Sequence, residues 1–254
     1  MKLKIIACKI FEKELASVTW CSPNIIDVTM IRQDYHVYPK KLHEVLQEEI
    51  DLFESGNDSH SNIGEDYDAI VIAYGLCSNC LVGIHSSKYP LVIPRAHDCN
   101  TIFLGSKEKY TETFTTYPGS FFYNQTWMKL GKLSDETDLE RKYNEYMEKF
   151  DDEDTVEYLL EMDKAMLKNY KHAIYMLWPD FAEQTYRDQV AERAAEKGWD
   201  YIEVDGSNRL LKNMVDGKWD ESDFLIVQPG QQVVAENGEL IIKAVPYEPL
   251  EEEE

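Results

Sequence analysis

The apolar run at residues 68–74, Asp-Ala-Ile-Val-Ile-Ala-Tyr, constrains the fold more than any other stretch of the chain. Its centre does not alternate between polar and apolar residues and is rich in β-branched side chains, as is typical of a strand buried on both faces. Such strands occur in parallel sheets that helices cover on both sides. Gly75 then turns the chain and brings Cys77 just beyond the carboxyl end of the strand. We therefore expect an α/β protein.

Strand and helix patterns alternate around this run. Short apolar runs predict strands at 3–8, 28–32, 68–74 and 90–94, and periodic apolar residues predict helices at 12–18 and 38–53. Ser106 is the expected N-cap of a further helix over 107–113. Alternating strands and helices predict a mostly parallel sheet with flanking helices.

The second half has a similar order of patterns. Strands are expected at 173–177, 201–204 and 223–227, with helices at 180–197 and 208–215. This order parallels that of residues 3–74 and suggests an internal duplication into two similar halves. A C-terminal β-hairpin is expected over 233–245, with Asn237-Gly238 as a two-residue turn.

The domain organisation that follows has three parts. Residues 1–130 form an N-terminal α/β half, residues 131–170 an acidic helical connector of two helices, and residues 171–254 a C-terminal α/β half with the hairpin and an acidic tail. The aromatic stretch 117–127 is expected to be a loop that packs the domain edge.

Composition limits the class of partner and the location. The 254 residues include 48 Asp and Glu against 26 Lys and Arg, a net charge of -22 that would repel nucleic acid and anionic membranes. No stretch looks like a signal peptide or approaches the roughly 20 apolar residues of a spanning helix, so we expect a cytoplasmic protein. In that compartment five cysteines are expected to be thiols or metal ligands and not disulfides.

Cysteine and histidine residues follow three of the predicted strands. Cys8 ends the first strand, Cys77 follows the apolar run, and His97 and Cys99 follow the strand at 90–94. Because the carboxyl ends of parallel strands meet at one edge of a sheet, these four side chains are expected to converge there. They predict a site for Zn²⁺, or for a 4Fe-4S cluster if three or four thiolates take part. Arg95 and Asp98, beside them, are the candidate catalytic groups.

These cysteines also have simpler interpretations. Any single cysteine of the set is more readily explained as a small buried residue, but four soft ligands at one edge favour a metal site. A cysteine nucleophile, Cys77 or Cys99 with His97, is an alternative that leaves Cys8 unexplained. Cys80 and His85 stay open as further ligands, and Cys21 is expected to be structural. The sequence has no glycine-rich phosphate loop, no Gly-x-Ser-x-Gly and no His-Glu-x-x-His.

Several short stretches together resemble the bacterial and archaeal family catalogued as domain of unknown function 1638. They are Ile6-Ala-Cys8, Tyr74-Gly-Leu-Cys77, Pro94-Arg-Ala-His-Asp-Cys99, Leu104-Gly-Ser106, Gly217-Lys-Trp219 and Pro229-Gly230. The resemblance implicates Cys8, Cys77, His97 and Cys99; Cys80 and Trp178-Pro179 depart from the family pattern. Members tend to be encoded beside corrinoid-dependent methyltransferase systems. By association, the resemblance implies methyl transfer in one-carbon metabolism, with a corrinoid protein or a methyltransferase as partner.

Three functions remain open, in this order of preference. The first is a zinc-dependent enzyme or accessory protein of methyl transfer, in which Zn²⁺ activates a thiol or hydroxyl of a small-molecule substrate. The second is an iron-sulfur protein of the quinolinate-synthase type, with one open iron site. The third is a non-catalytic module that binds a corrinoid or a partner protein and has a structural metal. A homo-oligomer is compatible with each.

Overall fold

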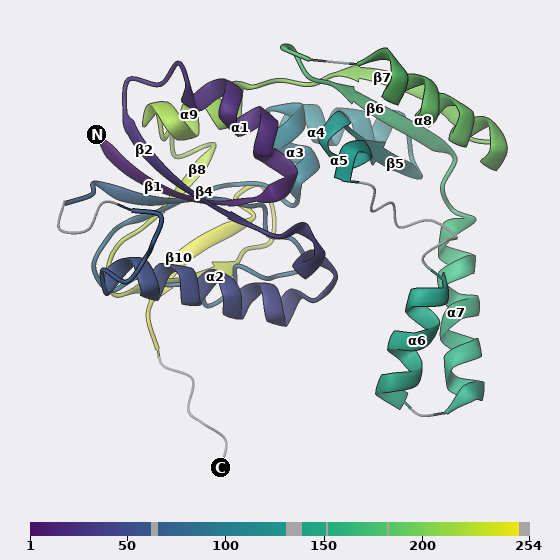
Figure 1. Cartoon of the computed structure of the whole chain (residues 1–254), viewed down its shortest axis with the longest axis horizontal. Helices are drawn as coiled ribbons and strands as arrows, with labels where there is room; N and C mark the ends of the chain where they lie inside the picture. Colours follow the sequence, from purple (N-terminus) through teal and green to yellow (C-terminus); the bar gives the residue numbers. More distant parts are fainter. Residues whose placement is uncertain (62–65, 131–138, 151, 182, 249–254) are drawn as a thin grey trace. The chain divides into compact units, whose positions relative to one another are not determined.

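The computed structural model describes residues 1–61, 66–130, 139–150, 152–181 and 183–248 (Figure 1). It divides into two compact units, Met1–Tyr110 with Gly206–Glu254, and Thr111–Asp205. The boundaries expected near 130 and 170 differ from this division, because the segment that begins at Gly206 returns to the first unit. The predicted acidic tail at 251–254 lies outside the described residues.

A five-stranded sheet in the order β2-β1-β3-β4-β8 forms the core of the first unit. Its strands are β1 (Lys2–Cys8), β2 (Ile25–Ile31), β3 (Ala69–Ala73), β4 (Leu91–Pro94) and β8 (Phe224–Val227). The first four are parallel, and β8 pairs antiparallel with β4. Every residue of β1, β3 and β4 is buried, as apolar runs in a covered parallel sheet require. The predicted α/β fold with mostly parallel sheets and flanking helices is confirmed.

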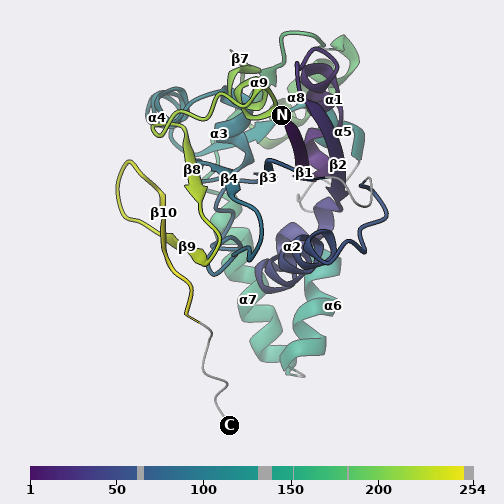
Figure 2. The same ribbon diagram turned by 90° about the vertical axis from the view of Figure 1, so that its left-hand side faces the viewer.

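Helices cover both faces of this sheet. The helices α1 (Glu12–Thr19), α3 (Cys99–Leu104) and α9 (Arg209–Asp216) lie on one face and α2 (Pro39–Glu54) on the other (Figures 1 and 2). The apolar stripe of α2, Leu42, Leu46 and Ile50, is buried against the sheet, and its proline is in the first turn. Two short 3-10 helices, η1 (Lys9–Phe11) and η2 (Gln33–Val37), follow β1 and β2. The helix α4 (Lys107–Thr116) begins as expected, with Ser106 Oγ accepting from Lys109 N at 3.0 Å.

The charged side chain of Lys4 lies inside this core. Lys4 of β1 has no exposed surface, and its ammonium group donates to Asp58 and, at 3.0 Å, to Ser61 Oγ. The Asp58 carboxylate also accepts from His60 N at 2.8 Å. Burial by itself would raise the pKa of Asp58, but these hydrogen bonds outweigh it and hold that pKa below its usual value. The buried lysine is thus part of a satisfied structural ion pair.

The predicted C-terminal hairpin forms, but the two-residue turn is wrong. The strands β9 (Gln231–Ala235) and β10 (Ile242–Pro246) pair antiparallel with Ala235 opposite Ile242, so residues 236–241 make the connection. Arg95 explains the longer loop, because its guanidinium donates hydrogen bonds to the carbonyl groups of Leu240 and Ile242. A turn at Asn237-Gly238 would commit part of this backbone to the strand ladder.

The second unit contains a parallel sheet in the order β5-β6-β7. Its strands are β5 (Ser120–Tyr123), β6 (His172–Leu177) and β7 (Asp200–Asp205), and Val190 and Ala194 of α8 (Gln184–Lys197) share a buried cluster with residues of β5 and β6. The stretch 117–127, predicted as a loop, contains β5 and the start of α5 (Gln125–Leu130). Its aromatic residues do pack: the Phe121 ring stacks on Trp127, with centroids 5.3 Å apart.

The predicted pair of acidic helices is α6 (Leu139–Phe150) and α7 (Glu153–Leu167), joined by an ion pair between Lys142 and Asp163 at 2.8 Å. The last strand of the supposed repeat, β8, belongs to the first sheet, whereas β6 and β7 pair with β5. The second half therefore repeats the order of elements of the first half but does not build the same sheet. Among the described residues, none of the helices has both the length and the apolar character that a bilayer span requires.

Candidate functional site

The candidate site lies at the carboxyl edge of the first sheet, where β1 stands between β2 and β3. The chain leaves β1 toward β2 on one side and later returns as β3 on the other, and ligands of open α/β sheets bind at such a switch point. Cys8 is the last residue of β1. Ala7 is paired with Ala73, so the next residues along the two strands, Cys8 and Tyr74, are neighbours at this edge.

The loops after β3 and β4 are joined through their backbones. Leu76 N donates to Ala96 O at 2.8 Å, and Cys77 N donates to His97 O at 2.9 Å. A Cβ added to Gly75 would lie 2.7 Å from the Asp98 Cα, so only glycine allows this approach. The contact brings Cys77 next to the segment that carries His97, Asp98 and Cys99.

Cys77 and Cys80 belong to a turn of left-handed backbone. Cys77, Ser78 and Asn79 have φ angles of 41°, 58° and 66°. This conformation costs side chains with a Cβ about 1–2 kcal/mol each. Cys77 and Cys80 are buried, whereas Ser78 and Asn79 between them are exposed. The strained turn thus directs both thiols of the Cys-x-x-Cys sequence into the protein.

Four cysteines, which we call the thiol cluster, gather at this edge: Cys8, Cys77, Cys80 and Cys99. Cys8, Cys77 and Cys80 are 6%, 6% and 1% exposed. Negative charge on Cys99, Cys80 or Cys8 would raise the pKa of Cys77. Negative charge on Cys8 would also raise the pKa values of Cys80 and Cys99.

Burial is the main reason why these thiols resist ionisation. It raises the pKa of Cys8 to about 11 and that of Cys80 to about 12. The pKa values of Cys77 and Cys99 are also well above the usual value because of burial and of neighbouring negative charge, including that of Asp98. All four are therefore neutral thiols at neutral pH unless a cation compensates.

Tyr74 borders the thiol cluster and was not among the predicted site residues. Its side chain is 2% exposed. Burial raises the pKa of the phenol well above its usual value, and the thiols of Cys8, Cys77 and Cys80 raise it further. The phenol interacts with the Cys8 thiol through a side-chain hydrogen bond of weak geometry, and no other partner of it lies in the described part of the chain. Its place beside Cys8, after the clearest buried strand, was the signal in the sequence that could have identified it.

Asp98 and Arg95 both have partners in the fold. Asp98 is the N-cap of α3, with Oδ1 accepting from Thr101 N at 3.1 Å, and Oδ2 accepts from Tyr110 Oη at 3.4 Å. The Arg95 guanidinium donates from Nε to Glu221 O at 2.8 Å and from Nη1 to the two hairpin carbonyls. Asp98 lies beside the thiols, whereas Arg95 ties the loop after β4 to the C-terminal hairpin.

His97 and the other candidate ligands lie apart from the thiols. The His97 side chain is exposed, with its ring centroid 6.3 Å from that of Tyr110. His85 stacks on Tyr247 at 3.9 Å, and Cys21 is exposed. The structure thus brings Cys80 together with Cys8, Cys77 and Cys99, and leaves His97 at the surface. As these side chains stand, no three His, Cys, Asp or Glu residues of the described ranges are arranged closely enough to hold a metal ion.

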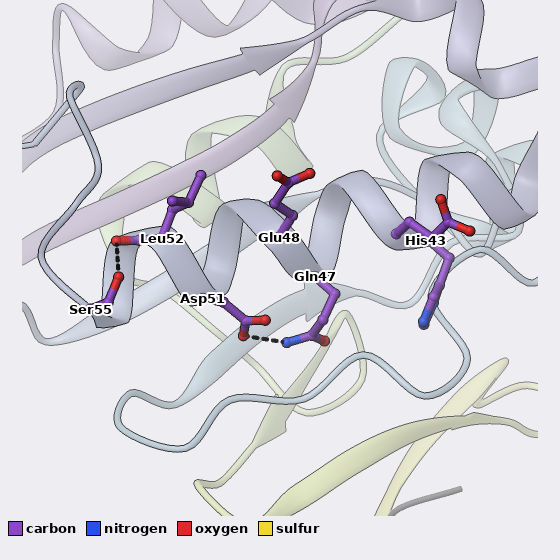
Figure 3. Close-up of a pocket in the computed structure, with 7 residues that line it drawn as sticks. His43, Gln47, Glu48, Asp51, Leu52 and Ser55 are labelled. Carbon is purple, nitrogen blue, oxygen red and sulfur yellow. Dashed lines mark hydrogen bonds between the residues drawn. The ribbon is translucent and has the colours of Figure 1, made fainter. Parts of the chain in front are cut away.

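A shallow hollow on α2 is separate from the thiol cluster (Figure 3). It is lined by His43, Glu44, Gln47, Glu48, Asp51, Leu52 and Ser55. Its polar side chains already have partners at two points: Gln47 Nε2 donates to Asp51 Oδ1 at 2.9 Å, and His43 Nδ1 lies 3.1 Å from the Cys80 carbonyl oxygen. Its open shape and these internal bonds make it a weaker candidate than the thiol cluster.

Comparison with known proteins gives one family. No curated protein and no solved structure matches the chain. A family model described as "Protein of unknown function (DUF1638)" matches residues 30–215. The match includes Tyr74, Cys77, Cys80 and Cys99 of the site, while Cys8 precedes it. Because the model covers well over half of the 254 residues, the chain belongs to the DUF1638 family, as its sequence motifs indicated.

Proposed function

We propose that the thiol cluster binds a soft metal ion, in the first place Zn²⁺, and that the protein acts in methyl transfer within one-carbon metabolism. The observation that carries the metal proposal is the meeting of four cysteines at the switch point of a parallel sheet. Thiolate sulfur is the donor that Zn²⁺ and iron-sulfur clusters select in proteins. The methyl-transfer part is supported by the family resemblance and by the position of the site, where α/β proteins bind small molecules.

The donor set agrees with a soft metal in its chemistry but not, as it stands, in its spacing. Since no three potential ligands are close enough together in the described arrangement, binding requires the side chains of Cys8, Cys77 and Cys99 to turn toward a common point. The main chain already brings Cys77 close to Cys99 through the bond between Cys77 N and His97 O.

In this proposal Cys8, Cys77 and Cys99 would hold the metal, which would supply Lewis-acid chemistry toward a thiol or hydroxyl of a substrate. The remaining roles fall to the chain itself. Asp98 starts α3 and fixes the direction of Cys99, and Arg95 holds the loop between β4 and α3 against the hairpin. His97, exposed beside the site, is available to a substrate or to a corrinoid-bearing partner.

An iron-sulfur cluster is the second candidate. It is favoured by one observation: the fourth soft side chain at the edge is the thiol of Cys80 and not the imidazole of His97. Clusters are held by thiolates, so three or four of these cysteines could bind one. A corrinoid- or partner-binding module with a purely structural metal is the third.

Metal analysis of anaerobically purified protein separates these candidates. We expect about one zinc per chain and no colour for the first candidate, and a brown protein with visible charge-transfer absorption for the second. Cys8→Ala and Cys99→Ala should each lose the metal, whereas Cys21→Ala, an exposed cysteine outside the cluster, should retain it. Absence of both zinc and iron from the wild type, or metal retained by both cluster variants, would contradict the proposal.

The methyl-transfer part has its own test. The zinc-loaded protein is mixed with methylcobalamin and a thiol, and demethylation is followed by the change in corrinoid absorption. Faster demethylation than in the Cys99→Ala protein supports the proposal; equal rates with a range of thiols would leave only the metal-binding part standing.

A further inference from the structure

The outer edge of the first sheet is formed by β2, which pairs with β1 on one side and, within the described residues, with no strand on the other. Edge strands of folded proteins are usually short or carry lysine, proline or a bulge, because their free N–H and C=O groups would otherwise pair with another chain. The seven residues of β2 pair with β1 without interruption and include neither lysine nor proline. The one charged residue of the strand, Asp27, accepts a hydrogen bond from the phenol of Tyr67. This edge therefore lacks the usual protection against a further strand.

One buried group on this strand also lacks a partner. The Thr29 side chain is 6% exposed, and its hydroxyl has no hydrogen-bond partner among the described residues. Leaving such a group unsatisfied costs about 1–3 kcal/mol, so buried polar groups in folded proteins nearly always have a partner. At the start of the same strand, the apolar side chain of Ile25 is 63% exposed. A strand added beside β2 would lie next to both side chains.

The residues of β2 are complementary to those of a second copy. When two copies of an edge strand pair antiparallel around a two-fold axis, directly opposite side chains point to the same face, so the axis passes between two identical residues. An axis at Val28 pairs all seven residues of the strand and places Asp27 opposite Thr29 of the second copy. Side chains in such positions have Cβ atoms about 4.5–5.5 Å apart, which allows the Thr29 hydroxyl to donate to the carboxylate. A carboxylate accepts several hydrogen bonds, so Asp27 can keep Tyr67 as a donor as well.

The neighbouring registers are less favourable. An axis at Asp27 would place the two carboxylates opposite each other, and like charges in that position are destabilising. An axis at Thr29 would place Asp27 opposite the apolar Ile31. Each of these registers also pairs only five of the seven residues of β2. Every other pair in the register at Val28 is apolar: Ile25 with Ile31, Ile26 with Met30, and Val28 with itself.

We propose that the protein forms a two-fold dimer through β2, in which the two five-stranded sheets join into one continuous sheet with Val28 at the axis. The partner is a second copy of this chain, because its β2 supplies the acceptor that Thr29 lacks and keeps the two Asp27 carboxylates apart. The inference does not depend on the proposed metal, since the interface is an edge of the sheet and the thiol cluster lies at the carboxyl ends of the strands. Each copy has a net charge of -22, so the dimer should be tighter at higher salt, where this repulsion is screened.

Sedimentation equilibrium of the full-length protein over a range of concentrations and salt tests the dimer. We expect a dissociation constant in the micromolar range, because a single strand pair is a small interface. Thr29→Val keeps the shape of the side chain without its hydroxyl and should raise the dissociation constant at least about tenfold, because each dimer loses two hydrogen bonds to carboxylates. Thr29→Ser keeps the hydroxyl and should match the wild type. The Thr29→Val monomer should be at least as stable to urea as the wild type, since it loses an unsatisfied group.

Cross-linking tests the register, in a Cys21→Ala background that removes the exposed native cysteine. Val28→Cys places two thiols opposite each other at the axis, and a bismaleimide of short span should join them into a covalent dimer. Ile25→Cys is the matched control, because Ile25 is the more exposed position but lies opposite Ile31 of the second copy. Its two thiols would be about 20 Å apart, the length of six residues of a strand, and should not be joined.

Three results would each overturn the inference. The first is a monomer at every concentration and salt, and the second is a dimer that Thr29→Val does not weaken. The third is cross-linking of Ile25→Cys as efficient as that of Val28→Cys, because thiols that meet by collision or through another surface would favour the more exposed position. None of these results bears on the thiol cluster, which metal analysis tests separately.

Discussion

The pH dependence of zinc affinity is the sharpest test of the thiol cluster. Each cysteine that binds Zn²⁺ does so as a thiolate, and each must first lose its proton. In the metal-free protein the pKa of Cys8 is about 11 and that of Cys80 about 12, so both are protonated at neutral pH. Zinc binding should therefore release one proton for every thiol ligand.

The size of the effect follows from these values. At pH 7 a thiol of pKa 11 is ionised in only about one molecule in ten thousand. The apparent affinity should rise about tenfold per pH unit for each thiol ligand, which is about a thousandfold for three cysteines and about ten-thousandfold for four. For thiols with the usual pKa of 9.0, the zinc affinity would stop rising near pH 9. Because the pKa values of these cysteines are raised, the affinity should keep rising steeply above pH 9.

Calorimetry in buffers of different ionisation enthalpy counts the protons directly, and chelator competition from about pH 6.5 upward gives the slope. Close to four protons per zinc would identify Cys80 as the fourth ligand. Close to three would favour three cysteines with an imidazole, because histidine has a usual pKa of about 6.5 and contributes little above it. Release of fewer than two protons would refute the assignment of the thiol cluster as the ligand set.

Two further predictions concern the fold around the site. Ser78→Gly should increase the free energy of unfolding in urea by about 1 kcal/mol, because it removes one strained left-handed side chain, whereas Ser78→Ala should not; equal stability of both variants would contradict the strain. Lys4→Met should lower the free energy of unfolding by about 3–5 kcal/mol, because it leaves the Asp58 carboxylate buried and unpaired. The double variant Lys4→Met with Asp58→Leu should recover most of this loss. Unchanged stability of the single variant would contradict the argument. The stabilisation from Asp58, whose pKa is lowered, should be present above the usual value of 3.8 and be lost as the pH falls below it.

The location of the site was predictable from sequence, because it depends on strands that have a strong signal. Residues 68–74 are apolar throughout, and a strand of that kind belongs in the middle of a parallel sheet. Once β1, β3 and β4 are parallel neighbours, Cys8, Cys77 and Cys99 must follow their carboxyl ends. That conclusion needs only the direction of the strands.

The membership of the cluster was not predictable, because it depends on local backbone geometry. The choice between His97 and Cys80 is decided by two turns. Asp98 caps α3, so the helix begins at Cys99 and His97 precedes it with an exposed side chain. The left-handed turn at 77–79 buries Cys80, although few side chains with a Cβ adopt that conformation. The register of the C-terminal hairpin was missed for a related reason, since a distant guanidinium, that of Arg95, binds its carbonyl groups.

Features that oppose stability occur where the sheet ends, beside the candidate site. Within β1, the buried Lys4 has a carboxylate and a hydroxyl as partners, so this charge is satisfied. At the carboxyl edge, by contrast, Gln33 Oε1 is buried without a hydrogen-bond partner among the described residues, and the turn at 77–79 is strained. Each such feature costs about 1–3 kcal/mol, a large part of the net stability of a domain. Strain and unsatisfied groups of this kind cluster at ligand sites, because a bound ligand can satisfy what the fold alone does not. A bound metal would supply the positive charge that thiolates at this edge would need. We therefore expect zinc to raise the midpoint of thermal unfolding of the wild type more than that of Cys8→Ala.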